Sequence, residues 1–363
     1  MRTGHFGFIA RSFAGALLVH AFMQLLPPPA EGGVEIVQKD DFSLELGLRL
    51  QPRMEIERVG APGDTMDWRD FLVRRTRIKI DGKMHAARYK FEWKIDRTDQ
   101  LGAKPSASVE NAYVQYPLGR GVELRAGLYD LPYSRDRLTS DSKQLAVDRG
   151  TVSNVPDAHG LADNAVGFHF LGKVAGDRAE YAVGLFDNRT KSAELQDIPM
   201  VAGRLDLNFG STKSVFNDAH FGNDSWYSLG LNGSYQGAIE DSTGGDDGSN
   251  AALGIDGMID VPTGPGRLFA RGEINALETK KPQGGSAVDT TVWMLGLGYL
   301  VLDQRLQPIV RFDRGGGGTR DMTYVGVNFY QKGHDLKVQA DIRLEAGTGN
   351  SVDGGRLQAQ VDF

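Results

Sequence analysis

Apolar and polar residues alternate along most of the chain. A period of two is the pattern of a β-strand that has one face against an apolar medium and the other against water. The alternation is clearest in 85–96 and nearly as regular in 336–346, and the final segment alternates in the same way and ends on Phe363. In the first of these segments the two faces are His85, Ala87, Tyr89, Phe91, Trp93 and Ile95 against Arg88, Lys90, Glu92, Lys94 and Asp96.

About sixteen segments with this period follow one another. No helical pattern separates them. They centre on residues 42–57, 70–81, 85–96, 108–117, 122–129, 164–172, 178–187, 200–209, 225–237, 250–261, 266–278, 289–301, 306–313, 321–330, 336–346 and 355–363.

The connections between these segments alternate in length. Gly82–Met84 and Leu118–Gly121 are short, whereas Val59–Arg69 and Asn188–Pro199 are longer and more polar. Short turns on one side and long loops on the other are typical of outer-membrane barrels. The connection 210–224 breaks this rule, because it should be short and is not. It is either an extended turn or a sign that a strand is misplaced there.

The pattern predicts an all-β fold, a transmembrane antiparallel β-barrel of about sixteen strands, which is wide enough to enclose an aqueous channel. A final alternating strand that ends in Phe is usual in bacterial outer-membrane barrels. Phe363 is therefore expected to guide membrane insertion through the barrel-assembly machinery. A large secreted β-sandwich or β-helix is the alternative fold, but neither explains the alternating lengths of the connections.

The first thirty residues resemble a secretory signal peptide, which leaves 31–363 as the barrel. Arg2 and Arg11 provide positive charge, and Phe13–Leu26 is an apolar stretch that ends at prolines and a possible cleavage site near Ala30. An uncleaved anchor helix is the alternative. The rest of the chain is too polar for a helical membrane protein, since 40% of all residues are hydrophobic and the mean hydropathy is −0.33. The absence of cysteine fits passage through an oxidising periplasm.

The longest connection, Asp130–Asp163, is expected to fold into the barrel and narrow its bore, because a loop of this length in a compact domain is usually functional or disordered. Its cations would then face the passing solute. The alternative is an external loop whose charges are simply solvated. The expected constriction residues are Arg135, Arg137, Lys143 and Arg149.

Four stretches resemble the phosphate-selective porins O and P: Phe71–Gly82 with its doubled arginine, Glu110–Tyr116, Leu124–Asp141 and Tyr181–Asn188. They follow the family's order and cover roughly residues 70 to 190, while the remainder matches in architecture. The resemblance implies a trimeric channel of sixteen strands, with its third external loop folded into the lumen.

Parity assigns the charged face of the strands to the lumen, because an Arg or Lys facing lipid near the bilayer centre would cost about 2–4 kcal/mol. In the second segment this puts Leu72, Thr76, Ile78 and Ile80 on the lipid face and Val73, Arg75, Arg77 and Lys79 on the lumen face. Arg88, Lys90, Lys94 and Arg125 extend the basic face onto neighbouring strands, and Arg204, Arg271 and Arg343 also point inward by parity. Acids share this face, namely Glu92, Asp96, Glu123, Asp206, Asp256, Asp260, Glu273, Asp341 and Glu345.

These features predict a porin in the bacterial outer membrane that lets small hydrophilic solutes diffuse passively, with a preference for anions. General diffusion and true phosphate selectivity both remain open. The expected partners are small anions such as phosphate, outer-membrane lipid, and two further copies in a homotrimer. A nucleic-acid partner is not expected from a net charge of −6.

The alternative of another class is an outer-membrane barrel enzyme or a surface adhesion scaffold. The histidines are scattered, and the chain has neither a Gly-x-Ser-x-Gly elbow nor a His-Glu-x-x-His motif. No catalytic residue, metal ligand set or cofactor is therefore predicted. The connection 241–250 carries oxygen ligands suited to Ca²⁺ but lacks the register of an EF-hand, so a flexible acidic loop is favoured.

Overall fold

The structure is a computed structural model. It describes residues 33–58, 66–96, 106–176, 178–187, 199–210, 216–239, 248–280, 286–316, 320–345 and 351–363. The predicted signal peptide, 1–30, lies outside the described residues, as does most of the connection 241–250 with its potential calcium ligands. No described helix is long and apolar enough to cross a membrane.

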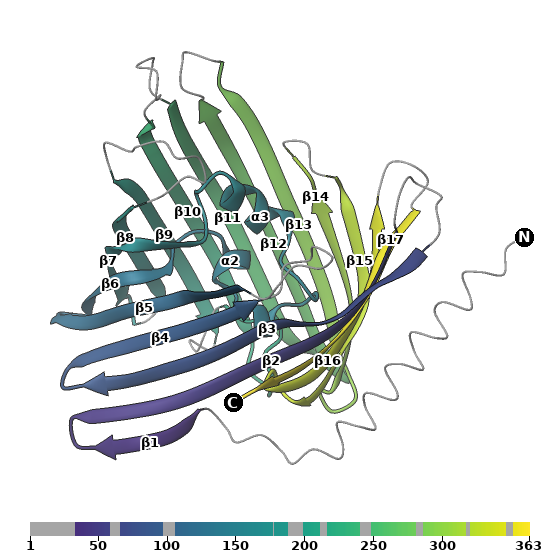
Figure 1. Ribbon diagram of the computed structural model, residues 1–363, viewed down its shortest axis with the longest axis horizontal. Coiled ribbons are helices and arrows are strands. Elements are labelled where there is room, and N and C mark those ends of the chain that lie inside the picture. The colour runs from purple at the N-terminus through teal and green to yellow at the C-terminus, as the bar shows by residue number, and fades with distance from the viewer. Residues whose placement is uncertain are drawn as a thin grey trace, which may run out of the picture.

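Within the described residues, sixteen antiparallel strands, β2 to β17, form a closed barrel (Figure 1). Each strand pairs with the next along the chain, and β17 pairs with β2 to close the ring. The predicted fold class and strand number are confirmed. The strands are β2 (Phe42–Arg58), β3 (Met66–Met84), β4 (Ala87–Asp96), β5 (Ser106–Gly119), β6 (Val122–Asp130), β7 (Asn164–Val174), β8 (Ala179–Asp187), β9 (Met200–Gly210), β10 (Trp226–Ile239), β11 (Gly248–Thr263), β12 (Gly266–Lys280), β13 (Val288–Leu300), β14 (Leu306–Arg314), β15 (Met322–Lys332), β16 (Leu336–Glu345) and β17 (Ser351–Asp362).

A further short strand, β1 (Val34–Lys39), adds to the predicted set. It forms a hairpin with the first residues of β2 and continues the edge that β17 occupies farther along β2. Phe363 lies between the two, and its backbone exchanges hydrogen bonds with Leu48 at 2.6 and 2.9 Å. All six residues of β1 are exposed, so both faces of the strand meet the surroundings. This explains why no period of two marks it in the sequence.

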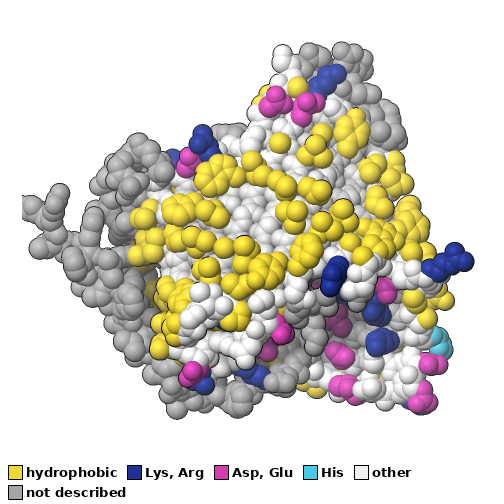
Figure 2. All heavy atoms as spheres, turned by 180° about the vertical axis from the view of Figure 1, so that it is seen from behind, with side chains coloured by type: hydrophobic (Ala, Val, Ile, Leu, Met, Phe, Trp, Pro, Cys, Tyr) yellow, Lys and Arg dark blue, Asp and Glu magenta, His cyan; other side chains and the backbone are white. Residues whose placement is uncertain are grey.

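The outward positions of the strands form an apolar belt, which Figure 2 shows as a band of hydrophobic side chains across one side of the barrel. On β11, Leu253 and Ile255 are 73% and 44% exposed, whereas Asp256 and Asp260 are 2% and 1% exposed. The two faces of each strand therefore differ as a lipid-facing wall around a polar interior requires.

Two face assignments in β3, those of Leu72 and Val73, are wrong. Leu72 is buried inside the barrel, whereas Val73, which the sequence assigned to the lumen with Arg75, is 45% exposed on the outside. The cause is a β-bulge. Gln51 pairs with Arg75 but the next residue of β2 pairs with Val73, so Arg74 is an extra residue in β3. One extra residue reverses the parity of the positions before it, here as far as a second shift, where Glu55 pairs with Asp70 and Ile56 with Trp68.

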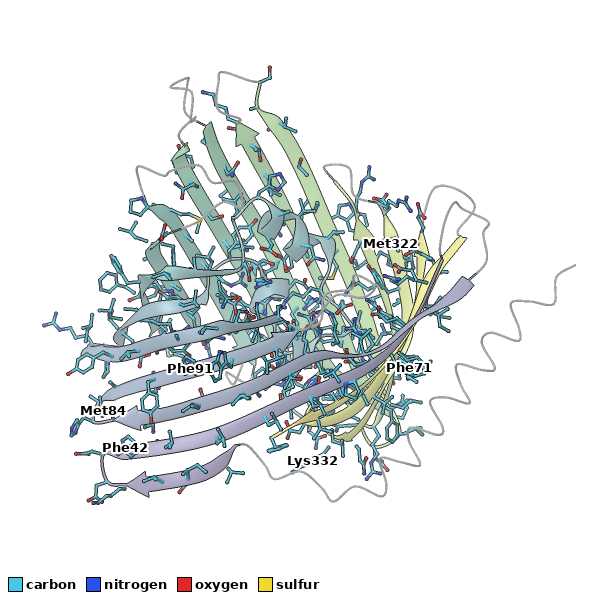
Figure 3. The ribbon with its side chains drawn as sticks, viewed as in Figure 1. Phe42, Phe71, Met84, Phe91, Met322 and Lys332 are labelled. Carbon is cyan, nitrogen blue, oxygen red and sulfur yellow. The ribbon has the colours of Figure 1, made fainter. Side chains whose placement is uncertain are left out.

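Short turns join the strands at one end of the barrel, as the alternating connections predict. Two residues each, 85–86 and 264–265, connect β3 to β4 and β11 to β12. In Figure 3, Met84 and Lys332 mark this end, and Met322 marks the opposite end. We refer to the first as the turn end of the barrel.

The connection between β9 and β10 lies at the turn end and is truly long, so no strand is misplaced there. We refer to its last part, 216–225, as the turn segment. It packs against the barrel interior. The Asp218 carboxylate accepts a hydrogen bond from the backbone of Leu145 at 2.9 Å, and His220 stacks on Trp226 with ring centroids 4.2 Å apart.

The connection between β6 and β7, which we call the β6–β7 loop, contains α2 (Arg135–Leu138), the 3₁₀-helix η1 (Asp141–Lys143) and α3 (Thr151–Ala158). Figure 1 draws α2 and α3 in the space that the strands surround. Side chains of well-separated strands bond to this loop. Asn275 of β12 donates to the carbonyl of Val152 at 2.8 Å, and Asn328 of β15 donates to that of Leu145 at 2.9 Å.

The largest apolar cluster joins the β6–β7 loop to the inner wall. Each fully buried aliphatic or aromatic side chain contributes about 1.5–3 kcal/mol. The cluster therefore anchors α3 and the segments beside it against strands that are far away in the sequence. Its members include Leu131, Tyr133, Val152, Val155 and Leu161 from the loop and Phe186, Met200, Leu277, Val292 and Met294 from the strands.

Candidate pore and its charged lining

Asp148 of the β6–β7 loop meets arginines from three strands at the point where the barrel closes. Its carboxylate lies 2.8 Å from Arg53 of β2, 3.2 Å from Arg75 of β3 and 2.6 Å from Arg356 of β17. Burial opposes ionisation, but these guanidinium groups hold the pKa of Asp148 well below its usual range. The structure thus places Arg75 in ion pairs with the loop.

Asp141 of η1 binds the same basic wall farther along β3. It lies 3.0 Å from Arg75 Nε and 3.6 Å from Arg77 Nη2, and it also pairs with Arg149 of its own loop. Burial again opposes ionisation, while Arg149, Arg75 and Arg77 hold the pKa of Asp141 well below its usual range. Arg77 is further bound by Asp96 of β4, at 3.0 Å.

The other predicted cations of β3 and β4 have carboxylate partners on neighbouring positions of the wall. Long inward-facing side chains reach partners on the same strand, on the next strand or two strands away. This part of the lining is therefore a ladder of ion pairs. The pairs are Lys79 with Asp362, Arg88 with Glu123 (2.6 Å), Lys90 with Glu92 (3.4 Å) and Lys94 with Glu110.

The cations of the β6–β7 loop are mostly paired as well. Among the described residues, no carboxylate lies within ion-pair distance of Lys143, and burial together with Arg49 lowers the pKa of that lysine. The other loop pairs are Arg135 with Asp256 (2.6 Å) and Asp206 (3.2 Å), and Arg137 with Asp130 (3.1 Å) and Asp163.

The inward positions that parity predicts for Arg204, Arg271 and Arg343 agree with the structure, since each meets an acid inside the barrel. Arg271 lies 2.6 Å from Asp136 of the loop and 2.8 Å from Asp218 of the turn segment. It thereby ties both segments to β12.

Sequence reasoning missed the role of the loop's carboxylates, Asp136, Asp141 and Asp148. The run Arg135-Asp136-Arg137 offered a signal, because alternating charges in a loop usually find partners of opposite sign. The loop is bound to the wall through its acids as much as through its bases.

Arg125, like Lys143 of the loop, differs from the paired cations. Among the described residues, no carboxylate lies within ion-pair distance of it. Its Nε and Nη2 donate to Gln115 Oε1 at 2.9 and 2.7 Å, and its guanidinium lies over the ring of Tyr113, 4.5 Å from the centroid. These contacts fix the side chain in place and leave its charge uncompensated by a neighbouring acid.

A cavity of about 590 Å³ lies beside Arg125, along the inner face of β5 to β9. The β6–β7 loop and Phe216 of the turn segment bound it on the other side. It reaches the turn end of the barrel at Arg88 and Lys173. The lining from the strands includes Arg125, His169, Leu171, Glu180, Ala182 and Arg204.

Comparison with known proteins shows that part of the chain matches a known family. Residues 46–224 match the model of the family described as phosphate-selective porin O and P. A relative from Aquifex aeolicus (strain VF5), itself described as an uncharacterized protein, is 28% identical over 177 residues. That match spans 43% of this chain and 42% of the relative, which is less than half of its length.

Solved structures of outer-membrane channels share the fold. The chain is similar to OmpF of Salmonella typhi (TM-score 0.59, 11% identity, 91% of this chain and 100% of that one) and to the anion-selective porin of Comamonas acidovorans (0.57, 12%, 89% and 100%). The channel DcaP of Acinetobacter baumannii is comparable (0.56, 12%, 92% and 100%). At these identities the likeness shows the fold alone.

The matched region begins within β2 and ends in the turn segment, so it contains the doubled arginine, the β6–β7 loop and the strands that line the cavity. An apolar belt around a charged interior suits a barrel that crosses a lipid bilayer, which for this fold is the bacterial outer membrane. Residues 46–224 therefore match the family of phosphate-selective porins O and P, and by this match and its fold the chain is an outer-membrane porin.

Proposed function

We propose that this porin is a passive channel for small hydrophilic solutes with a mild preference for anions. One observation carries the proposal. The cavity along β5 to β9 contains Arg125, whose charge no described carboxylate neutralises. A fixed cation beside a narrow aqueous path attracts anions and repels cations. Solute passes Arg125 and leaves the barrel past Arg88 and Lys173 at the turn end.

The preference is mild because acids bind most of the basic wall. Arg75 and Arg77 are held by Asp141 and Asp148 of the β6–β7 loop. Selective binding of phosphate over other anions would need several uncompensated donors around one point. The paired wall favours general diffusion of small anions, phosphate among them, over strict phosphate selectivity.

In this proposal the β6–β7 loop is the constriction. Its apolar cluster and its ion pairs hold it against strands as far apart as β2 and β11. This is expected for a loop that must keep the width of the channel constant. Lys143 of the loop is a second cation, after Arg125 of β6, that has no described carboxylate within ion-pair distance. Arg135, Arg137 and Arg149 fasten the loop, because each is engaged by carboxylates.

The remaining partners are part of the same proposal. The apolar belt contacts outer-membrane lipid, three copies form a homotrimer, and the strand that ends at Phe363 guides insertion by the barrel-assembly machinery. A solved structure of OmpT from Vibrio cholerae with the same fold is described as a trimer form. We propose that residues 1–30 direct export, and that the channel works without a cofactor or catalytic step.

Single-channel recording tests the proposal. Purified protein in a planar bilayer, under a KCl gradient, should show steady conductance and a reversal potential displaced toward the equilibrium potential of chloride. Phosphate at equal ionic strength should carry current without blocking that of chloride. A cation-directed reversal potential would refute the anion preference, and the absence of conductance would refute the channel. Block by low concentrations of phosphate would instead establish phosphate selectivity.

A further inference from the structure

We infer that the cavity along β5 to β9 contains a binding site for small organic carboxylates. Arg125 and His169 would hold the carboxylate, and apolar side chains beside them would hold the organic part. The site rests on the channel function proposed above, because it lies on the proposed path and names a class of solute for it.

Arg125 presents a fixed donor to the cavity. Two of its nitrogens are used by Gln115, and its guanidinium also lies near the rings of Tyr113 and Tyr129, 4.5 and 5.5 Å from their centroids. Nη1 is the nitrogen that these hydrogen bonds leave unused. A guanidinium that is already ordered loses little side-chain freedom when it binds a planar carboxylate.

His169 lies directly beside this donor. It is opposite Arg125 in the register of β6 and β7, so the two side chains are neighbours on the inner face. It is 4% exposed, and neither ring nitrogen has a hydrogen-bond partner among the described residues. Buried polar groups are nearly always satisfied, so an imidazole without a partner on a cavity wall points to a ligand. A neutral imidazole can donate one hydrogen bond to a carboxylate oxygen.

Between His169 and the turn end, the cavity wall consists of small or apolar residues. Gly184 faces His169 on β8, and an added Cβ there would come within 2.4 Å of the histidine Cβ. Phe186 of β8 and Tyr129 of β6 pack edge-on against the imidazole, with ring centroids 6.2 and 4.9 Å away. Leu171 and Ala182 follow toward the turn end, and Leu138 and Phe216 face them across the cavity. The volume of about 590 Å³ lies within the range of about 300–1,000 Å³ of small-molecule sites.

The balance of charge favours a monoanion with an apolar part over a compact dianion. Arg125 brings one uncompensated positive charge, while Glu123, Glu180 and Asp206 also line the cavity. Each of these acids is paired with a cation of the lining, Arg88, Lys173 or Arg204, so Arg125 leaves one net positive charge for a monoanion to neutralise. An inorganic anion gains nothing from Leu171 or Phe216. Benzoate, which combines one carboxylate with a ring, is therefore a suitable probe.

The experiment measures interruption of the KCl current through single channels by benzoate, acetate and phosphate. Benzoate should block at a concentration at least about tenfold lower than acetate, because burial of two or more apolar carbons is worth about a factor of ten. Phosphate should not block at the benzoate concentration. Block by benzoate and acetate at equal concentrations would overturn the site, as would block by phosphate at the benzoate concentration.

Variants locate the site. Arg125→Gln and His169→Ala should each raise the blocking concentration of benzoate, the first by at least about tenfold as expected for loss of a charged hydrogen-bond donor. Arg125→Lys should fall between Arg125→Gln and the parent. Arg343→Gln is the control of equal charge change, because Arg343 lies on β16 and pairs with Glu57.

Folding of each variant is checked by the heat-dependent shift of the barrel on a gel. If Arg125→Gln folds and benzoate block persists unchanged, the site is wrong even though the channel proposal stands. A parent protein that folds and conducts no current would instead refute the channel function itself.

Discussion

At the residue scale, the ion pairs of the β6–β7 loop decide how much of the basic wall acts on a passing ion. Asp148 alone contacts Arg53, Arg75 and Arg356. Removal of one partner from a buried ion-pair network typically costs about 3–5 kcal/mol, because the remaining charges lose their compensation. Arginine keeps its proton, so those charges stay on the wall and can attract anions from the bore.

Asp148→Asn should therefore increase the anion preference and weaken the docking of the loop. The reversal potential under a KCl gradient should move further toward the chloride potential than in the parent. Asp289→Asn removes the same charge from an exposed position at the start of β13 and serves as the control. An unchanged or cation-directed potential in Asp148→Asn would show that this carboxylate does not screen the wall.

Parity predicted which residues point inward but could not predict their partners. The direction of Arg204 or Asp256 follows from the backbone alone, because successive side chains of a strand alternate. The contact between Asp148 and Arg356 joins residues that are 208 positions apart. It depends on the path of a loop without a period of two, so nothing local in the sequence specifies it.

At the element scale, the bulge in β3 shows where counting by twos fails. Arg74 is the extra residue, and the positions on either side of it keep their own faces: Val73 points outward and Arg75 inward. Doubled arginines look like one regular step in the sequence, so the change of parity is invisible until the pairing with β2 is known.

Deletion of Arg74 should be tolerated, because it removes the bulge and leaves Val73 and Arg75 on opposite faces. Deletion of Thr76, a regularly paired neighbour, should prevent folding, since it turns one part of the strand to the wrong face. The heat-dependent gel shift after refolding into lipid measures both. If the two deletions behave alike, the register of β2 and β3 is not as described.

The anchoring of α3 gives a second prediction at this scale. Val152 is fully buried in the apolar cluster, whereas Asn154 on the same helix is exposed. Val152→Asp buries an unpaired charge, which costs several kcal/mol, and should release the helix from the wall. Single-channel conductance should then rise and become noisier, while Asn154→Asp should leave it near the parent value. Unaltered conductance in a folded Val152→Asp variant would mean that α3 does not limit the bore.

The sequence predicts strands that have one polar and one apolar face, and β11 and β16 match the expected segments closely. β1 was not predicted because both of its faces are exposed. The turn segment was recognised as too long for a turn, but its packing inside the barrel depends on contacts with β12 and with the loop, such as Asp218 with Arg271. Such contacts produce no periodic pattern in the sequence.

At the scale of the whole molecule, the interior is a balanced set of charges inside an apolar belt, although the chain as a whole carries −6. The carboxyls of Asp141 and Asp148, which fasten the loop, have pKa values below their usual range. Their contribution to loop docking is complete above the unfolded pKa of about 3.9 and is lost as the pH falls through the lower folded values.

Conductance and reversal potential should therefore stay constant from pH 8 down to about pH 5, since both carboxyls remain ionised throughout. The measurement is a series of single-channel recordings at fixed ionic strength over that range. A reversible opening or closing transition between pH 5 and 7 that is present in the parent and absent in Asp148→Asn would show that this carboxyl titrates there and does not hold the loop as described.

The most direct test of the central claim, that one face of each strand borders water and the other lipid, compares two adjacent residues of β6. Arg125 points into the cavity, whereas Ala126 is exposed on the outside. The chain contains no cysteine, so single variants report one position each. A water-soluble thiol reagent that cannot enter membranes should react with Arg125→Cys and reduce the single-channel conductance, and it should leave Ala126→Cys unmodified. Reaction at Ala126→Cys with protection at Arg125→Cys would contradict a water-filled pore bordered by the charged face.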